Sequence, residues 1–476
     1  METKLSEQNQ PLYSSAILFG IGGIIFSAIR VDLLWLLTSL LYTVLLYGTS
    51  KIRDIDEIQH GVFKWTPIPL ALGITGISPF IGSAWVLGDL AFAAFAPMLS
   101  FMILLNLAYH TRFKTNTSFT TFFIFMFTLA AGGISGIIKF LSDRHIGTVY
   151  LSSNHHLMIG LMVITLFGLI GTLIFILYLD RNLSKDRKKN GSEYLISEFL
   201  VSVKYFKSHF FNILNSYFWS KEDQSLLLTS KILQIGILAL VFFNLAVENS
   251  WALSIALISF GLSIIPSLRY QKFKISPSFQ FWISAALFFY VSGESLRFQG
   301  QFRWWNDFSH FLAGIVIGAL IIIFLLYLNE VFYKLHIPTS IIPIFVLTFI
   351  LSVGVIWETF EFLMDNLFGT SLQGGLRDTV FDMIGNTIGA FFALIITEMF
   401  TPFEVFNKVD QRYKKENWII DLKAYITNIP IFVLVIVSGF IGLFFVVLRA
   451  DLTLSIISSA LVVLIFGISK FSKRFR

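Results

Sequence analysis

Ionisable side chains gather in one part of the chain, between residues 304 and 389, where three apolar segments follow one another. Within each segment they recur every three or four residues, which places them on one face of a helix. Carboxylates beside a histidine can perform general acid–base chemistry, or they can bind a metal ion through oxygen and nitrogen. The spacing leaves both open. The candidate catalytic residues are His310, Glu358, Glu361 and Asp382, and the candidate substrate-binding residues are Asp307, Arg377, Asp378 and Asn386.

The composition indicates an integral membrane protein. Of the 476 residues, 55% are hydrophobic and 13% charged, and the mean hydropathy is +0.76, far from an ordinary soluble domain. The absence of cysteine excludes disulfides, iron–sulfur clusters and zinc–thiolate sites. The net charge of +6 does not indicate nucleic-acid binding, because the basic residues lie in short loops beside apolar segments. Membrane lipids are the expected partners, and no cofactor is assigned.

The apolar segments predict an all-α polytopic protein with about fourteen membrane spans. Basic residues concentrate in alternate loops, and the positive-inside bias then places both termini and the loop around Arg187 in the cytoplasm, with Arg303 and Gly375 outside. The expected spans are 14–29, 33–49, 67–85, 88–109, 119–141, 156–179, 232–247, 251–268, 279–296, 305–328, 340–363, 379–400, 429–448 and 452–471.

Internal similarity predicts a duplication. Residues 20–32 resemble 439–451, and a weaker third copy places Glu248 where Asp32 stands. Residues 139–148 resemble 361–370. Because six spans are an even number, two such copies would run in the same direction and form a parallel repeat. The expected divisions are a degenerate six-helix repeat (1–180), a basic amphipathic cytoplasmic linker (181–231), a second six-helix repeat (232–401), and a loop with a C-terminal helical hairpin (402–476).

The first repeat is expected to have lost most of its polar site. When Asp89 is aligned with Asp307, a phenylalanine stands where the second copy has His310. When Lys139 is aligned with Glu361, glycines stand at the positions of Glu358 and Asp382. The first half is therefore interpreted as scaffold, although His155 and His156, near the same outer face, leave a minor binding role open.

In the second repeat the three acidic segments should converge. With the predicted topology, Asp307 and Asp378 lie at the outer ends of their helices and His310 and Asp382 one turn deeper, about 5 to 6 Å. The site should therefore open outward. A plainer interpretation is that Asp307 and Asp378 only cap helix N-termini, where acidic side chains are favoured.

The order of these motifs resembles VanZ-like membrane proteins and, more closely, the related YjdF-type inner-membrane proteins. The resemblance covers residues 232–400. It implies a prokaryotic cytoplasmic membrane and, for VanZ-like members, resistance to glycopeptide antibiotics of the teicoplanin type. The extra N-terminal copy and the C-terminal hairpin depart from the family pattern. The motif residues are Asp307, His310, Glu358, Glu361, Gln373, Asp378, Asp382, Asn386, Thr387 and Gly389.

Three functions fit these observations. The first is binding or modification of an amphiphilic or lipid-linked envelope substrate that enters from the outer leaflet. The second is transport of a small solute or ion by two parallel repeats, although such proteins place the site near the midplane between the repeats. The third is a noncatalytic scaffold in which the cluster fixes three helices. The first is favoured.

Overall fold

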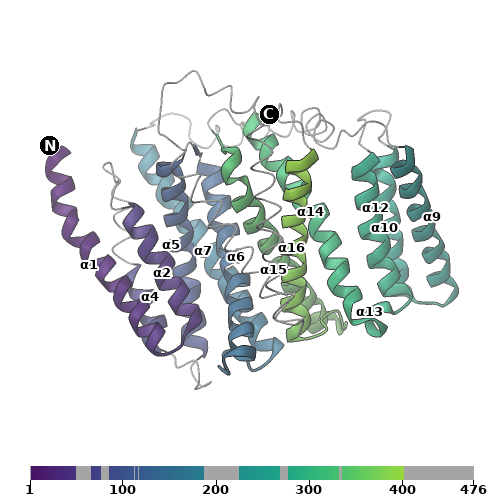
Figure 1. Ribbon diagram of the computed structural model, residues 1–476, viewed down its shortest axis with the longest axis horizontal. Coiled ribbons are helices and arrows are strands. Elements are labelled where there is room, and N and C mark those ends of the chain that lie inside the picture. The colour runs from purple at the N-terminus through teal and green to yellow at the C-terminus, as the bar shows by residue number, and fades with distance from the viewer. Residues whose placement is uncertain are drawn as a thin grey trace, which may run out of the picture. The chain divides into compact units, whose positions relative to one another are not determined.

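The computed structural model describes residues 2–49, 66–76, 85–111, 113–115, 117–186, 224–268, 277–331 and 335–400. These residues form helices joined by short connections (Figure 1). The first half contains α1 (Glu2–Ile29), α2 (Leu33–Thr49), α4 (Pro67–Gly76), α5 (Trp85–His110), α6 (Thr117–His145) and α7 (Asn154–Asp186). The second half contains α9 (Gln224–Ala246), α10 (Ser250–Leu268), α12 (Pro277–Ser295), the short α13 (Phe298–Gln301), α14 (Arg303–Val331), the 3₁₀ turn η1 (Thr339–Ile341), α15 (Ile342–Phe368) and α16 (Leu376–Phe400).

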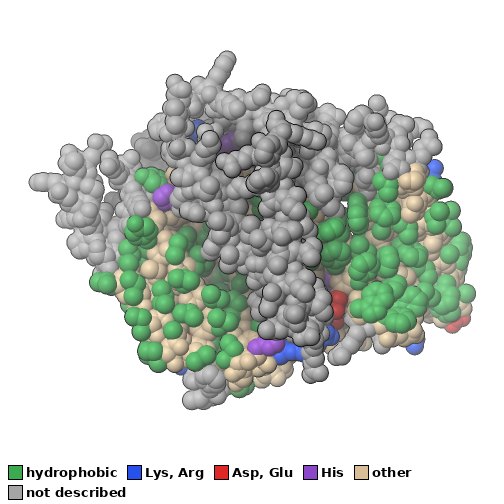
Figure 2. Space-filling view, viewed as in Figure 1, with side chains coloured by type: hydrophobic (Ala, Val, Ile, Leu, Met, Phe, Trp, Pro, Cys, Tyr) green, Lys and Arg blue, Asp and Glu red, His purple; other side chains and the backbone are tan. Residues whose placement is uncertain are grey.

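Seven of the described helices are long and apolar enough to cross a membrane: α5, α6, α7, α9, α14, α15 and α16. Three shorter apolar stretches lie in α1, α2 and α10. Figure 2 shows hydrophobic side chains over most of the described surface on the face in view, as expected for helices in contact with lipid. The expected class, a polytopic helical membrane protein, is therefore supported. The expected hairpin of residues 429–448 and 452–471 lies outside the described residues.

Two expected boundaries are wrong. Within the span predicted for 67–85, α4 covers Pro67–Gly76, whereas Trp85, its last residue, belongs to the next helix, α5. The linker predicted from residue 181 is helical at its start, because α7 continues to Asp186, and α9 begins at Gln224, before residue 232. Hydropathy marks the apolar part of a helix, whereas the helical backbone continues into the polar flanks. The remainder of the linker, 187–223, lies outside the described residues.

The two halves of the chain pack against each other mainly through α6 and α15. Aromatic rings from both helices form the contact: the Phe123 and Phe345 centroids lie 4.3 Å apart in an edge-to-face arrangement. Farther along, the Ser352 hydroxyl donates a hydrogen bond of 2.5 Å to the carbonyl oxygen of Met126. Both phenylalanines are fully buried. This contact places α15 between the first half and the remaining helices of the second half.

Small residues bring α14 and α16 close together. An added Cβ at Gly389 would lie 2.1 Å from the backbone oxygen of Phe311, and one at Gly314 would lie 2.3 Å from that of Asn386. Both positions therefore require glycine, as is common where membrane helices approach closely. The close approach fixes how the polar faces of α14 and α16 meet.

Corresponding turns in the two halves use the same hydrogen bonds. After α6, the Asp143 carboxylate accepts hydrogen bonds from the Thr148 hydroxyl and from the backbone of Tyr150 and Leu151. After α15, Asp365 accepts from Thr370, Leu372 and Gln373 at the same sequence offsets. Each loop is thereby tied to the end of its own helix. This sequence similarity thus has a structural counterpart.

A second pair of turns corrects the expected alignment of Glu248 with Asp32. Val31 and Glu248 both have a φ of 56°. The next residue in each chain segment, Asp32 or Asn249, accepts a hydrogen bond from the backbone N–H three residues further on. Glu248 therefore corresponds to Val31, and Asn249 corresponds to Asp32. The alignment based on residue type was shifted by one position.

Candidate functional site

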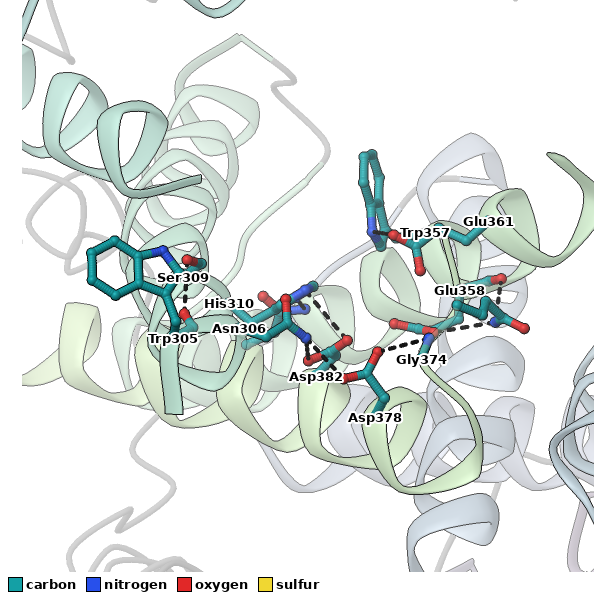
Figure 3. A network of polar contacts seen from close by, with 12 residues as sticks. Trp305, Asn306, Ser309, His310, Trp357, Glu358, Glu361, Gly374, Asp378 and Asp382 are labelled. Atoms are coloured by element: carbon teal, nitrogen blue, oxygen red, sulfur yellow. Dashed lines mark hydrogen bonds and ion pairs between the residues drawn. The ribbon is translucent and has the colours of Figure 1, made fainter. Parts of the chain in front are cut away.

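The α14 face that meets α16 carries Asn306 and His310, one helical turn apart (Figure 3). The Asn306 amide donates to Asp378 Oδ1 at 3.1 Å and to Asp382 Oδ1 at 2.8 Å. His310 Nε2 lies 3.4 Å from Asp382 Oδ2. Asp382 is 2% exposed, so both of its oxygens are turned away from the surroundings toward α14. These two α14 side chains therefore hold the acidic face of α16.

A second contact orients the His310 ring. The Asn386 amide nitrogen lies 3.3 Å from His310 Nδ1. An amide that donates to Nδ1 leaves the ring proton on Nε2, the atom that faces Asp382. The amide and the carboxylate thereby fix both the tautomer and the orientation of the ring.

The α15 side of the cluster holds two carboxylates. Glu358 is 2% exposed, and its Oε2 accepts a hydrogen bond of 3.4 Å from the Gln373 amide in the loop before α16. The Gln373 oxygen in turn accepts from Asn154 of α7 at 2.8 Å. Glu361 accepts a hydrogen bond of 2.8 Å from the Trp357 indole. Figure 3 shows Glu358 and Glu361 entering from the side opposite His310 and Asn306.

Asp378 has both of the roles that were weighed for it. It lies in the first turn of α16 and accepts a hydrogen bond of 3.1 Å from the backbone N–H of Gly374, which caps the helix. Gly375, between them, has a φ of 109°, a conformation that favours glycine. The same carboxylate also accepts from Asn306, so the cap is part of the cluster.

Two of the predicted residues are placed differently from the others. Arg377 stacks over the Phe381 ring, with 4.4 Å between the guanidinium carbon and the ring centroid, and makes no ion pair with the described carboxylates. Asp307 is half-buried on α14, but the contacts from α14 to the two aspartates are made by its neighbour Asn306. Sequence reasoning missed Asn306. Asn306 lies four residues before His310, and this helical spacing could have indicated that both side chains lie on the same face of α14.

The cluster has an excess of acidic groups. Glu358, Glu361, Asp378 and Asp382 lie within electrostatic range of one another. No described lysine or arginine forms an ion pair with any of them, and His310 is the only base in direct contact. Among the described residues, no group of three or more His, Asp or Glu side chains is arranged to hold a metal ion. The cluster can therefore accept protons and hydrogen bonds from outside the network.

The first half contains a buried charged cluster of its own, and the expectation that its polar site is largely lost is wrong. The Lys139 ammonium forms an ion pair with Asp89 Oδ1, and His156 Nε2 lies 3.5 Å from Asp89 Oδ2. An added Cβ at Gly160 would lie 3.1 Å from the same carboxylate. The sequence comparison named Asp89 and Lys139 but did not show that they pair, because they lie on different helices.

The fold and the site together define a polytopic helical membrane protein with a buried acidic cluster among α14, α15 and α16. Residues 227–401 match a family model described as "Predicted membrane protein (DUF2238)". The matched range contains the whole cluster and all but the first residues of α9. No curated protein and no solved structure matches the chain.

Proposed function

We propose that this protein resides in the cytoplasmic membrane of a prokaryote and binds or modifies an amphiphilic or lipid-linked envelope substrate at the α14–α16 cluster. Both termini are cytoplasmic in this proposal, and the cluster opens to the outer side. The basic loops and the resemblance to VanZ-like and YjdF-type proteins support the location. The observation that carries the function is the buried acidic group beside an oriented histidine, at one end of three membrane helices.

His310 and Asp382 form the proposed acid–base pair. Their facing atoms are 3.4 Å apart, and Asn386 holds the other ring nitrogen. When a substrate hydroxyl or amine replaces the Asn386 amide at Nδ1, that nitrogen can take the substrate proton and return it to a leaving group, while Asp382 stabilises the imidazolium through Nε2. Glu358, which Gln373 orients, is the second carboxylate within the cluster. Asp378 and Asn306 position the substrate-facing end of α16.

The two halves of the chain are inferred to be parallel copies of one six-helix unit. The matching turns at Asp143 and Asp365 support this inference, as do the matching turns at Val31 and Glu248. In α6 and α15, corresponding helices also lie in contact at the junction between the halves. The acidic cluster lies within the second copy, whereas a transporter of this architecture places its site between the copies. The enzyme or binding function is therefore preferred to transport.

The scaffold alternative is disfavoured by comparison with the first half. There the Asp89 carboxylate is neutralised by the Lys139 ammonium, as a structural ion pair requires. In the second half, four carboxylates lie within electrostatic range of one another and only Asp382 contacts a base, His310, an arrangement that stabilises a fold poorly. An arrangement that costs stability and lies on one side of the helix bundle is typical of a functional site.

The test uses a deletion strain complemented with variants. Glu358→Gln and Asp382→Asn keep side-chain volume and some hydrogen bonding, so each should abolish complementation while membrane expression and thermal stability stay close to wild type. Mass spectrometry of extracted envelope lipids and lipid-linked precursors would identify the compound that accumulates. The matched control is Glu248→Gln, because Glu248 is an exposed carboxylate remote from the cluster. Full complementation by both cluster variants, or loss in proportion to lost folded protein, would establish the scaffold alternative instead.

A further inference from the structure

The charged clusters of the two halves have opposite signs at corresponding positions. Lys139 lies four residues before Asp143 in α6, and Glu361 lies four residues before Asp365 in α15. Because Asp143 and Asp365 tie equivalent loops, Lys139 and Glu361 occupy equivalent places on their helices. An ammonium group in one half is thus replaced by a carboxylate in the other.

The acidic partner of Lys139 has no acidic counterpart on the facing helix. In the first half, the α5 residue that lies against Gly160 of α7 is Asp89. In the second half, the α14 residues that contact Asp382, the counterpart of Gly160, are Asn306 and His310. A carboxylate in the first half is therefore matched in space by an amide and an imidazole in the second. The second half has no internal ammonium where the first half has one.

An unsatisfied acceptor beside His310, elsewhere in the cluster, also lacks a donor. Asn386 is 7% exposed, and its amide nitrogen contacts His310 inside the cluster. Its Oδ1 is buried and has no hydrogen-bond partner among the described residues. Buried acceptors in proteins are nearly always satisfied by a donor. The carboxylates and this amide oxygen therefore form a set of acceptors that no described ammonium or guanidinium group contacts.

An ammonium group satisfies both requirements, because it carries one positive charge and three N–H donors and has no acceptor. We propose that the α14–α16 cluster binds the primary ammonium group of a ligand, in the role that the Lys139 ammonium fills in the first half. This inference deepens the proposed function by naming the ligand class, and it rests on that site being functional. Two sources share this chemistry: an aminophospholipid headgroup and a free amine.

The surroundings of Glu361 favour the lipid source. The Trp357 indole that donates to Glu361 is 40% exposed, and the neighbouring Phe360 is also exposed. Their ring centroids are 5.9 Å apart. In a membrane such exposed aromatic rings lie against acyl chains or headgroups, and they attract cations over their faces. A lipid could therefore rest on these rings while its headgroup reaches Glu361.

The test measures which lipid stays bound. The full-length protein is placed in nanodiscs with equal amounts of phosphatidylethanolamine and phosphatidylcholine of identical acyl chains, and native mass spectrometry reports the lipids retained. Wild type should retain the ethanolamine lipid at least about tenfold more than the choline lipid, because charge-assisted hydrogen bonds to a primary ammonium are unavailable to choline. Soluble ethanolamine that displaces the lipid completely would indicate a free amine as the source, and failure to displace it would indicate the lipid.

The decisive variant is Glu361→Lys, which supplies an internal ammonium at the position of Lys139. It should abolish the ethanolamine preference while thermal stability is kept or increased. Glu361→Gln should reduce the preference if the lysine variant fails to fold, and Glu248→Gln should leave it unchanged. Equal retention of both lipids by wild type, a preference that survives in the Glu361 variants, or stabilisation by sodium ions alone would overturn the proposal. If wild type shows no lipid selectivity but Glu358→Gln still fails to complement the deletion strain, the ligand class is wrong and the proposed function stands.

Discussion

The ion pair between Asp89 and Lys139 should contribute strongly to the stability of the first half. The two side chains are only 8% and 11% exposed, so neither charge has bulk water as an alternative partner. Asp89→Asn leaves the Lys139 ammonium buried without a carboxylate, which should cost about 3 to 5 kcal/mol of unfolding free energy. Lys139→Met should cost less, because His156 remains 3.5 Å from Asp89.

A double-mutant cycle isolates the pair. The variant with both changes contains neither charge, so its loss should be smaller than the sum of the single losses by at least about 2 kcal/mol. Unfolding free energies can be measured by denaturant titration in mixed micelles followed by circular dichroism. Glu248→Gln, an exposed change, should stay within about 0.5 kcal/mol of wild type. A coupling energy below about 0.5 kcal/mol would refute the assignment of a buried, mutually dependent pair.

Three further predictions concern packing, pH and orientation. Gly389→Ala should lower the unfolding free energy by about 1 to 3 kcal/mol, because the added Cβ overpacks against Phe311. Gly261→Ala is the control: a Cβ at this position has no atom within 4 Å and should leave the unfolding free energy unchanged in the same denaturant titration. Burial raises the pKa of the Asp32 carboxyl above its usual 3.8. The contribution of Asp32 to folding stability is therefore favourable at low pH and is lost as the pH rises through the folded-state pKa. The unfolding free energy of Asp32→Asn should accordingly change less with pH above 3.8 than that of wild type. Single cysteines are clean probes in a chain that has none, and a reagent that cannot cross the membrane should label Arg303→Cys but not Lys188→Cys.

Much of the helical organisation could be predicted from the sequence, because apolar runs of spanning length are a strong signal. The acidic spacing in the second half also indicated which faces of α15 and α16 carry the cluster. Which α14 residues join the cluster was harder to predict from the sequence. Asp307 and His310 fit the helical spacing as well as Asn306 and His310 do, and only the rotation of α14 against the glycines of α16 decides between them.

The first-half cluster could not have been found from spacing within one helix. Asp89, Lys139 and His156 lie on three different helices, and the pair that matters most is 50 residues apart. A residue-by-residue comparison with the second half was misleading. It looked for the same residue types at equivalent positions, whereas Lys139 stands where the second half has Glu361. Each residue looked isolated in its own apolar segment, and only the packing of α5, α6 and α7 brings them together.

The backbone pairing between Lys114 and His336 bears on how such a chain could arise. The N–H of each residue donates to the carbonyl oxygen of the other, at 2.9 and 2.8 Å. The interval between these two residues is the same as that between Asp143 and Asp365, so in the proposed duplication each is the counterpart of the other. A contact between equivalent residues is self-complementary, which is the property of an interface in a two-fold symmetric dimer. A protein with one such unit could make this contact with a second copy of itself. Once the genes of two such copies were fused, each half could change independently. The interior charges of the two halves were then free to become opposite.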